Sequence, residues 1–146
     1  MADKRTYPHR PFLAVSAAII RLDKVLLVRR SRKPALHLYT LPGGAVEAGE
    51  TLCDAVVREA REETALTIEP VALAGHREVI ARDPQGRVKR HFVILSFAAR
   101  WIAGEPVLSE ELDDARWVDF FDVGAYRTTE GLVEIVETAA RILSRG

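Results

Sequence analysis

Hydrophobic positions along the chain follow two different periods. Apolar, β-rich runs cover residues 12–21 and 24–30, and the short polar stretch between them predicts a hairpin. Two further β-rich stretches, about 67–82 and 87–100, flank the sequence Asp-Pro-Gln-Gly, which is typical of a turn and predicts a second hairpin. Both halves of the chain therefore supply strands for a sheet.

Two other segments, residues 52–64 and 129–143, carry apolar residues at intervals of three and four, which is the spacing of an amphipathic helix. The Pro- and Gly-rich residues 31–50 predict a long loop, and residues 103–114 predict an acidic loop before a short strand at 116–120. No internal repeat, low-complexity tract or linker interrupts this order. The pattern predicts one α/β domain.

This domain is expected to cover residues 12–146. Residues 1–11 are polar and contain two prolines, so we expect a flexible N-terminal arm there. A length of 146 residues is usual for a single domain. The hydrophobic content of 48% argues against intrinsic disorder, because it provides enough apolar surface to offset chain entropy.

The sequence also predicts where the protein works. No apolar run reaches the roughly 18 residues that a membrane span needs. Residues 4–20 loosely resemble a secretory signal, but the second apolar run at 24–30 favours a hairpin instead. The single cysteine cannot form an intrachain disulfide and fits a reducing compartment. We therefore expect a cytoplasmic protein without a membrane partner.

Charge is balanced in total but segregated along the chain. Lysine and arginine together number 21, as do aspartate and glutamate, which argues against a non-specific nucleic-acid binder. Basic residues concentrate in 21–33 and 76–100, and acidic residues concentrate in 47–69 and 105–122. If these blocks converge in space, they suit a site for a small, metal-bound anion.

The predicted helix 52–64 carries three acidic residues on the same stripe as its apolar residues: Glu59, Glu62 and Glu63. Carboxylates within one turn repel each other unless cations occupy the site. Mg²⁺ and Mn²⁺ prefer such oxygen ligands. The alternative is a surface helix on which Arg58 supports Glu62 at the i, i+4 spacing, and the acidic cluster by itself does not decide between the two.

The wider motif resembles the Nudix box. That pattern is Gly, five residues, Glu, seven residues, Arg-Glu, an aliphatic residue, any residue, Glu-Glu, any residue, Gly and an aliphatic residue. The chain matches it from Gly44 through Glu50 to the segment Arg-Glu-Ala-Arg-Glu-Glu-Thr-Ala-Leu at 58–66, and Leu-Pro-Gly-Gly at 41–44 also looks like the family's preceding loop. One fixed position differs: Ala65 replaces a glycine, and an alanine favours a different backbone conformation there.

The resemblance extends over about residues 12–143 and implies the Nudix fold, an α/β/α sandwich with a central mixed β-sheet and a loop–helix–loop. It implies that Glu59 and Glu63 are the main metal ligands, that Glu62 is a further ligand or a base, and that the backbone carbonyl of Gly43 joins the metal shell. The other motif residues are expected to hold the loop and the helix together: Gly44, Glu50 and Arg58.

Residues outside the motif complete the predicted site. Glu110 and Glu111, in the acidic loop, are candidates for the catalytic base, with solvated loop acids as the alternative. Arginine suits bidentate phosphate contacts, and we expect one or two of the basic residues to bind substrate. The candidates are Arg30, Arg77 and Arg90.

The resemblance implies a metal-dependent hydrolase that cleaves the pyrophosphate bond of a nucleoside diphosphate linked to another moiety. Mg²⁺ is the expected cofactor, and Mn²⁺ can substitute. ADP-ribose or a related nucleotide sugar is the first candidate substrate, giving AMP and a sugar phosphate, because residues 82–87 resemble segments in some ADP-ribose-cleaving members. A (d)NTP pyrophosphohydrolase and a non-catalytic nucleotide-binding regulator are the alternatives. The expected partner is a small nucleotide rather than a nucleic acid, and a homodimer is left open.

Overall fold

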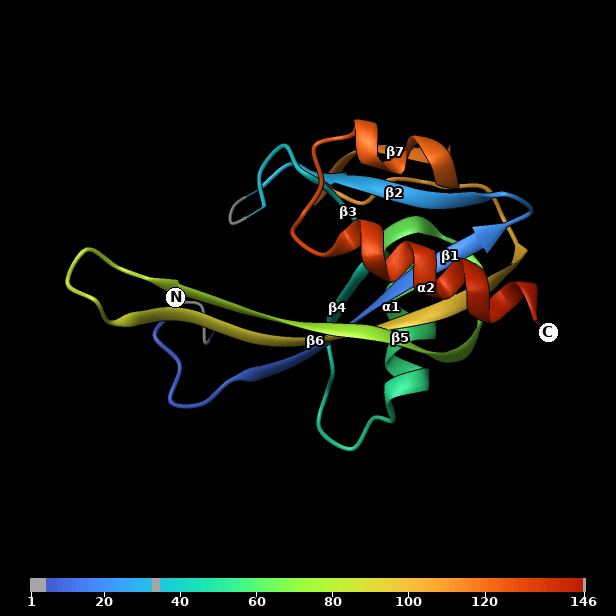
Figure 1. Cartoon of the computed structure of the whole chain (residues 1–146). Helices are drawn as coiled ribbons and strands as arrows, with labels where there is room; N and C mark the ends of the chain where they lie inside the picture. The colour runs from blue at the N-terminus through green and yellow to red at the C-terminus, as the bar shows by residue number, and fades with distance from the viewer. Residues whose placement is uncertain (1–4, 33–34, 146) are drawn as a thin grey trace.

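The computed structural model describes residues 5–32 and 35–145, and Figure 1 shows a mixed sheet between two helices. The elements in chain order are β1 (Phe12–Arg21), β2 (Lys24–Arg30), β3 (Tyr39–Thr40), β4 (Gly43–Ala45), α1 (Leu52–Thr64), β5 (Thr67–Arg82), β6 (Val88–Ala103), β7 (Leu112–Asp119), the 3₁₀ helix η1 (Phe120–Ala125) and α2 (Leu132–Ser144). No helix in the described part of the chain is long and apolar enough to cross a membrane.

The sheet has the strand order β3-β2-β1-β6-β5, with β4 paired to β1 and β7 paired to β2. β1 and β6 are parallel, whereas the other pairs are antiparallel. Helices α1 and α2 lie on opposite faces (Figure 1). Alternate side chains of β1 divide between them, since Val15 and Ile19 pack with α1 whereas Ala18 packs with α2. The predicted α/β/α sandwich with a central mixed sheet is confirmed.

The first predicted hairpin is much shorter than its sequence pattern indicates. β1 and β2 pair at only two positions, Ile20 with Val25 and Arg21 with Lys24. The reason is that β1 uses its remaining length to pair with β6 and β4, while β2 pairs with β7. Burial on both faces gives β1 and β2 their continuous apolar runs.

The second predicted hairpin is confirmed and is long. β5 and β6 pair from Thr67 with Ala103 to Arg82 with Val88, with irregularities in register along the way. Its turn end projects beyond the body of the molecule (Figure 1). The described part of the N-terminal arm, 5–11, contacts this hairpin, because the N–H of Tyr7 donates to the carbonyl of Lys89 at 2.8 Å. Residues 1–4 and 146 lie outside the described residues.

Two element boundaries differ from the sequence prediction. The acidic loop is shorter than 103–114, because β6 extends to Ala103 and β7 begins at Leu112. The last helix begins at Leu132 rather than at 129, because the N–H of Thr129 donates instead to the carbonyl of Tyr39 at 3.0 Å, and Gly131 takes a left-handed conformation at the N-cap.

Helix α1 begins and ends with defined caps. The hydroxyl of Thr51 accepts from the N–H of Asp54 at 3.1 Å, as the sequence indicates. At the other end Ala65 has φ 64° and ψ 13°, and its N–H donates to the carbonyl of Arg61. The expectation of a different conformation for this alanine is therefore wrong. The left-handed turn closes the helix even without glycine.

Ala65→Gly is expected to raise the free energy of unfolding by about 0.5–1 kcal/mol. A left-handed alanine costs about 1–2 kcal/mol, which glycine would relieve. The greater freedom of glycine in the unfolded chain offsets part of that stabilisation. Urea unfolding followed by circular dichroism measures the change. An equal or lower stability for the variant would contradict the view that this residue is strained.

Candidate active site

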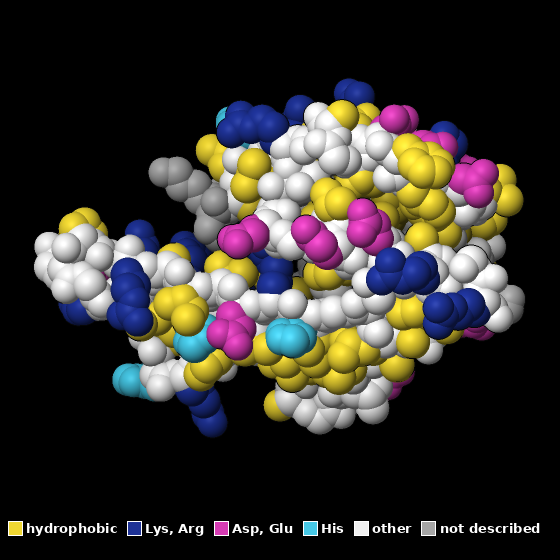
Figure 2. All heavy atoms as spheres, in the orientation of Figure 1, with side chains coloured by type: hydrophobic (Ala, Val, Ile, Leu, Met, Phe, Trp, Pro, Cys, Tyr) yellow, Lys and Arg dark blue, Asp and Glu magenta, His cyan; other side chains and the backbone are white. Residues whose placement is uncertain are grey.

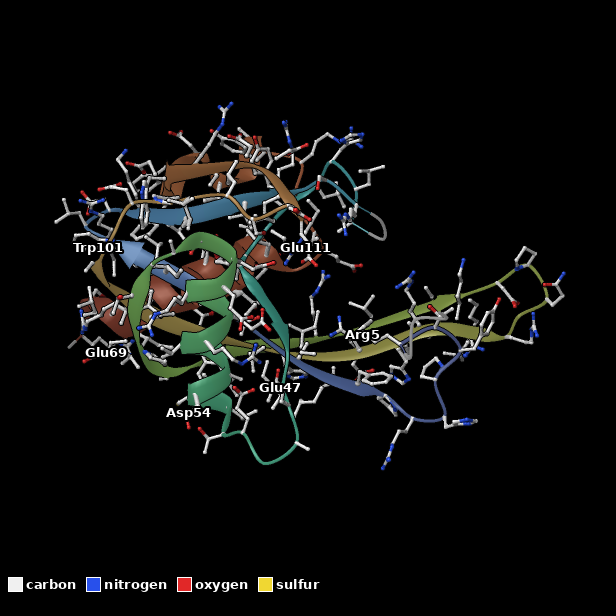
Figure 3. The ribbon with its side chains drawn as sticks, turned by 180° about the vertical axis from the view of Figure 1, so that it is seen from behind. Arg5, Glu47, Asp54, Glu69, Trp101 and Glu111 are labelled. Carbon is white, nitrogen blue, oxygen red and sulfur yellow. The ribbon has the colours of Figure 1, made fainter. Side chains whose placement is uncertain are left out.

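Three glutamates of α1, Glu59, Glu62 and Glu63, meet the loop before β7 at one cavity of about 400 Å³. Figure 3 shows Glu111 near the C-terminal end of α1, opposite the end that carries Asp54. The sheet contributes the short strand β4 to the same cavity. The cavity is lined by Arg5, Gly43, Gly44, Ala45, Glu59, Glu62, Glu63, Ser109, Glu110 and Glu111.

Arg58 joins the loop before α1 to the helix. Its Nε donates to Glu50 at 2.6 Å, its Nη2 donates to the carbonyl of Ala45 at 2.9 Å, and its Nη1 donates to Glu59 at 2.8 Å. The bond with Arg58, helped by the N–H of Glu47, lowers the pKa of Glu50 to about 2. Arg58 and Glu50 lie where the resemblance expects residues that fix the loop and orient Glu59.

Glu59 lies half-buried against a glycine. A Cβ on Gly44 would lie 2.4 Å from the carboxylate carbon of Glu59, so any larger residue at position 44 would displace this carboxylate. Burial raises the pKa of Glu59, and the neighbouring guanidinium of Arg58 opposes that rise. The carboxylate is thus set into the wall of the cavity and depends on nearby positive charge.

Glu63 is the most buried of the three, with only 5% of the residue exposed. Its Oε1 accepts from the N–H of Gly43 at 2.9 Å, and its Oε2 accepts from Nη1 of Arg30 at 2.5 Å. Gly43 is fixed by its pairing with Ser16 in β1, and Arg30 is the last residue of β2. Two strands therefore hold one carboxylate of α1.

Glu62 differs from its two neighbours because its side chain is 60% exposed and contacts Arg58 at 3.2 Å. Glu110 and Glu111 are also exposed, but their loop is anchored to the residue after β2. Ser31 forms both bonds. Its N–H donates to the carbonyl of Glu111 at 3.0 Å, and its hydroxyl donates to the carbonyl of Glu110 at 3.1 Å. The structure thus brings both proposed base candidates to the same cavity as the carboxylates of α1.

The donor set fits a hard divalent cation. Carboxylate oxygens, together with the carbonyl of Gly43, are the ligands that Mg²⁺ prefers. The hydroxyl of Ser109 is buried at this cavity without a hydrogen-bond partner among the described residues, as expected for a group that faces a further ligand. Among the described residues, no three acidic, histidine or cysteine side chains are positioned closely enough to hold one cation together. In this structure Glu59 forms an ion pair with Arg58, and Glu63 forms an ion pair with Arg30.

A second cavity of about 350 Å³ continues from the first, since Arg5, Gly43, Gly44 and Glu111 line both. It is strongly basic and contains all three predicted substrate contacts. Five arginines line it: Arg5, Arg30, Arg32, Arg77 and Arg90.

Arg77 and Arg5 show how distant segments supply this charge. Arg77 is fixed by donating to the carbonyl of Glu130 at 2.8 Å, and burial lowers its pKa. Arg5 comes from the N-terminal arm, where it lies between the projecting hairpin and the body of the molecule (Figure 3). Figure 2 shows further basic side chains along this hairpin. No motif in the sequence indicates a role for Arg5.

A third, smaller cavity of about 130 Å³ lies between the sheet and α2 and shares Arg30 and Arg77 with the basic one. Ser16 and Ser96 line it, and their hydroxyl groups share a hydrogen bond of 2.8 Å. The sequence pattern does not indicate either serine as a site residue, because each falls within an apolar strand and only the pairing of β1 with β6 brings them together.

Comparison with known proteins agrees with this arrangement. A sequence model of the NUDIX domain matches residues 10–139. The ADP-ribose pyrophosphatase of Methanocaldococcus jannaschii is 40% identical over 119 residues, which cover 82% of this chain and 66% of that protein. The chain spans between 37% and 66% of the length of such curated relatives.

Two solved structures extend the agreement to the fold. The MutT NUDIX hydrolase of Burkholderia pseudomallei has a TM-score of 0.77 and 28% identity, covering 89% of this chain and 98% of its own. The NUDIX domain of Shewanella oneidensis NrtR, in complex with ADP ribose, has a TM-score of 0.70 and 26% identity, covering 92% and 89%. The match over residues 10–139 and the shared fold show that this chain belongs to the Nudix family.

Proposed function

We propose that this chain hydrolyses the pyrophosphate bond of a nucleoside diphosphate linked to another moiety, with Mg²⁺ as cofactor and Mn²⁺ as a substitute. The observation that carries the proposal is the junction of two cavities, one lined by the carboxylates of α1 and the other by arginines. Cation ligands and phosphate ligands thus meet at Gly43 and Gly44, which line both cavities. A pyrophosphate bound across this junction would contact both the cation and the arginines.

The carboxylates of Glu59 and Glu63 and the carbonyl of Gly43 would hold the cation, with Glu62 at the exposed side. Bound there, a divalent cation neutralises phosphate charge and lowers the pKa of a water. The arginines orient the phosphates by bidentate contacts. An exposed carboxylate from the loop before β7, Glu110 or Glu111, accepts the proton of the attacking water.

ADP-ribose is the first candidate substrate. The relative in Methanocaldococcus jannaschii is named an ADP-ribose pyrophosphatase, and the Shewanella oneidensis domain binds ADP ribose in its crystal. Cleavage would give AMP and ribose 5-phosphate. A (d)NTP pyrophosphohydrolase is the second candidate, because the motif residues do not distinguish the two activities. A non-catalytic regulator is disfavoured, because Glu59, Glu62 and Glu63 are all present.

A hydrolysis panel tests the proposal. Purified protein is incubated with ADP-ribose, other nucleotide sugars, dinucleoside polyphosphates, and all NTPs and dNTPs, with Mg²⁺, with Mn²⁺ or with EDTA, and the products are separated by chromatography. We expect metal-dependent release of AMP from ADP-ribose at the highest kcat/KM of the panel. Preference for a (d)NTP would select the second candidate, whereas no metal-dependent turnover of any compound would overturn the proposed function.

A further inference from the structure

Arg30 stands at the boundary between the carboxylates and the basic cavity. It is the last residue of β2, its side chain is 21% exposed, and its Nη1 donates to Oε2 of Glu63 at 2.5 Å. The same side chain lines the arginine-rich cavity together with Arg77 and Arg90. One guanidinium thus touches a proposed cation ligand and also borders the proposed phosphate site.

Both oxygens of Glu63 already accept a hydrogen bond in the cation-free structure, so a cation would share this carboxylate with its present partners. The N–H of Gly43 occupies Oε1, and Arg30 occupies Oε2. The backbone donor belongs to a paired strand and cannot move away alone, whereas the arginine side chain can rotate. A cation approaching Glu63 would also be repelled by the guanidinium charge, and repulsion is strong at a partly buried site. The two cations therefore compete for one carboxylate.

The basic cavity offers Arg30 another position. Arginine forms bidentate contacts with phosphate as readily as with carboxylate, because its planar donor fork fits both. A bound pyrophosphate would supply acceptor oxygens beside Arg77 and Arg90, within the cavity that Arg30 already lines. Release from Glu63 would then not leave the guanidinium without a partner.

We propose that Arg30 neutralises Glu63 in the cation-free protein and transfers to a substrate phosphate when a divalent cation takes its place. This inference rests on the proposed function. By thermodynamic linkage, cation and anionic substrate each strengthen the binding of the other, since each favours the released position of Arg30. Arg30 thus couples the two sites, in addition to contacting the substrate.

Arg30→Gln is expected to move the two affinities in opposite directions. Binding of Mn²⁺ alone, measured by calorimetry at mildly alkaline pH, should become about tenfold tighter, because the competing guanidinium is gone. Binding of the non-hydrolysable α,β-methylene analogue of ADP-ribose to the Mn²⁺-saturated protein should become about tenfold weaker, because a charge-assisted phosphate contact is lost.

Arg29→Gln is the matched control. Arg29 precedes Arg30 on the same strand, and its Nε is paired with Asp113 at 2.6 Å, away from the described cavities. The variant loses the same charge one residue away, so both affinities should stay near those of the unchanged protein. If Arg30→Gln does not fold, Arg30→Lys should show smaller shifts in the same two directions, because lysine keeps the charge but lacks the planar fork.

The sign of the Mn²⁺ effect decides the inference. Weaker or unchanged Mn²⁺ binding in Arg30→Gln would overturn it, since a residue that merely orients Glu63 would help the cation to bind. Failure of the proposed function can be distinguished from failure of this inference, because Mn²⁺ binding is measured without turnover. A protein that follows the expected pattern but cleaves nothing in the substrate panel would overturn the proposed function alone, and one that binds no Mn²⁺ would overturn both.

Discussion

Replacing Glu59 with Gln is expected to lower kcat for ADP-ribose hydrolysis about 10²–10³-fold, with a much smaller effect on KM. Glutamine keeps the shape of the side chain but removes the negative charge from a half-buried position against Gly44. The loss falls on kcat because a cation ligand acts mainly on the charge that develops in the transition state. Steady-state kinetics at saturating Mg²⁺ measure it.

Glu69→Gln is the control for this variant. Glu69 is an exposed residue of β5 that lies away from Glu111 and the site, as Figure 3 shows, and it undergoes the same isosteric change. Its kcat should remain within about twofold of the unchanged protein. Unfolding curves of both variants separate catalytic loss from misfolding. A folded Glu59→Gln protein with more than a tenth of the original kcat would show that Glu59 is not an essential ligand.

Gly43→Ala is expected to have the largest effect on stability, a loss of about 3 kcal/mol in the free energy of unfolding. The added Cβ would lie 2.1 Å from the carbonyl oxygen of Val15 and 2.7 Å from the Cα of Ser16. Both atoms belong to the backbone of the central strand β1, so relief requires the pairing of β4 with β1 to open. Urea titration followed by circular dichroism measures the change.

Gly124→Ala provides the matched comparison for the same substitution. No atom outside the chain neighbours lies within 4 Å of a Cβ added at Gly124, which is part of η1. Its stability should change by no more than about 0.5 kcal/mol. If Gly43→Ala were as stable as Gly124→Ala, the close approach of β4 to β1 would not be a constraint on the site.

The core of the site could be predicted from sequence because its geometry is local. Helical spacing places Glu59 and Glu63 one turn apart, and the N-cap of α1 follows from Thr51. The bonds of Arg58 to Glu50 and Glu59 also fall within a short stretch of chain. Local backbone geometry therefore determines most of the loop–helix–loop.

Contacts between distant segments could not be predicted in the same way. A hydrophobic pattern shows which strand residues are buried, but it does not show which strand lies beside them, so the parallel pairing of β1 with β6 was missed. The bond between Arg30 and Glu63 and the place of Arg5 depend on that pairing and on the neighbouring strands. Ala65 shows a further limit, because helix closure overrides the preference of a single residue.

The parallel pairing of β1 with β6 also has a consequence for folding kinetics. It joins positions 80 residues apart, as in the bond between Ser16 and Ser96. Closing so long a loop costs entropy before its contacts form, and such non-local pairing slows folding. Helix α1 can form from local contacts, but Arg77 and Arg90 of the β5–β6 hairpin join Arg30 and Gly43 in the basic cavity only once β1 has paired with β6. During refolding, helical signal should therefore return before phosphate-binding capacity.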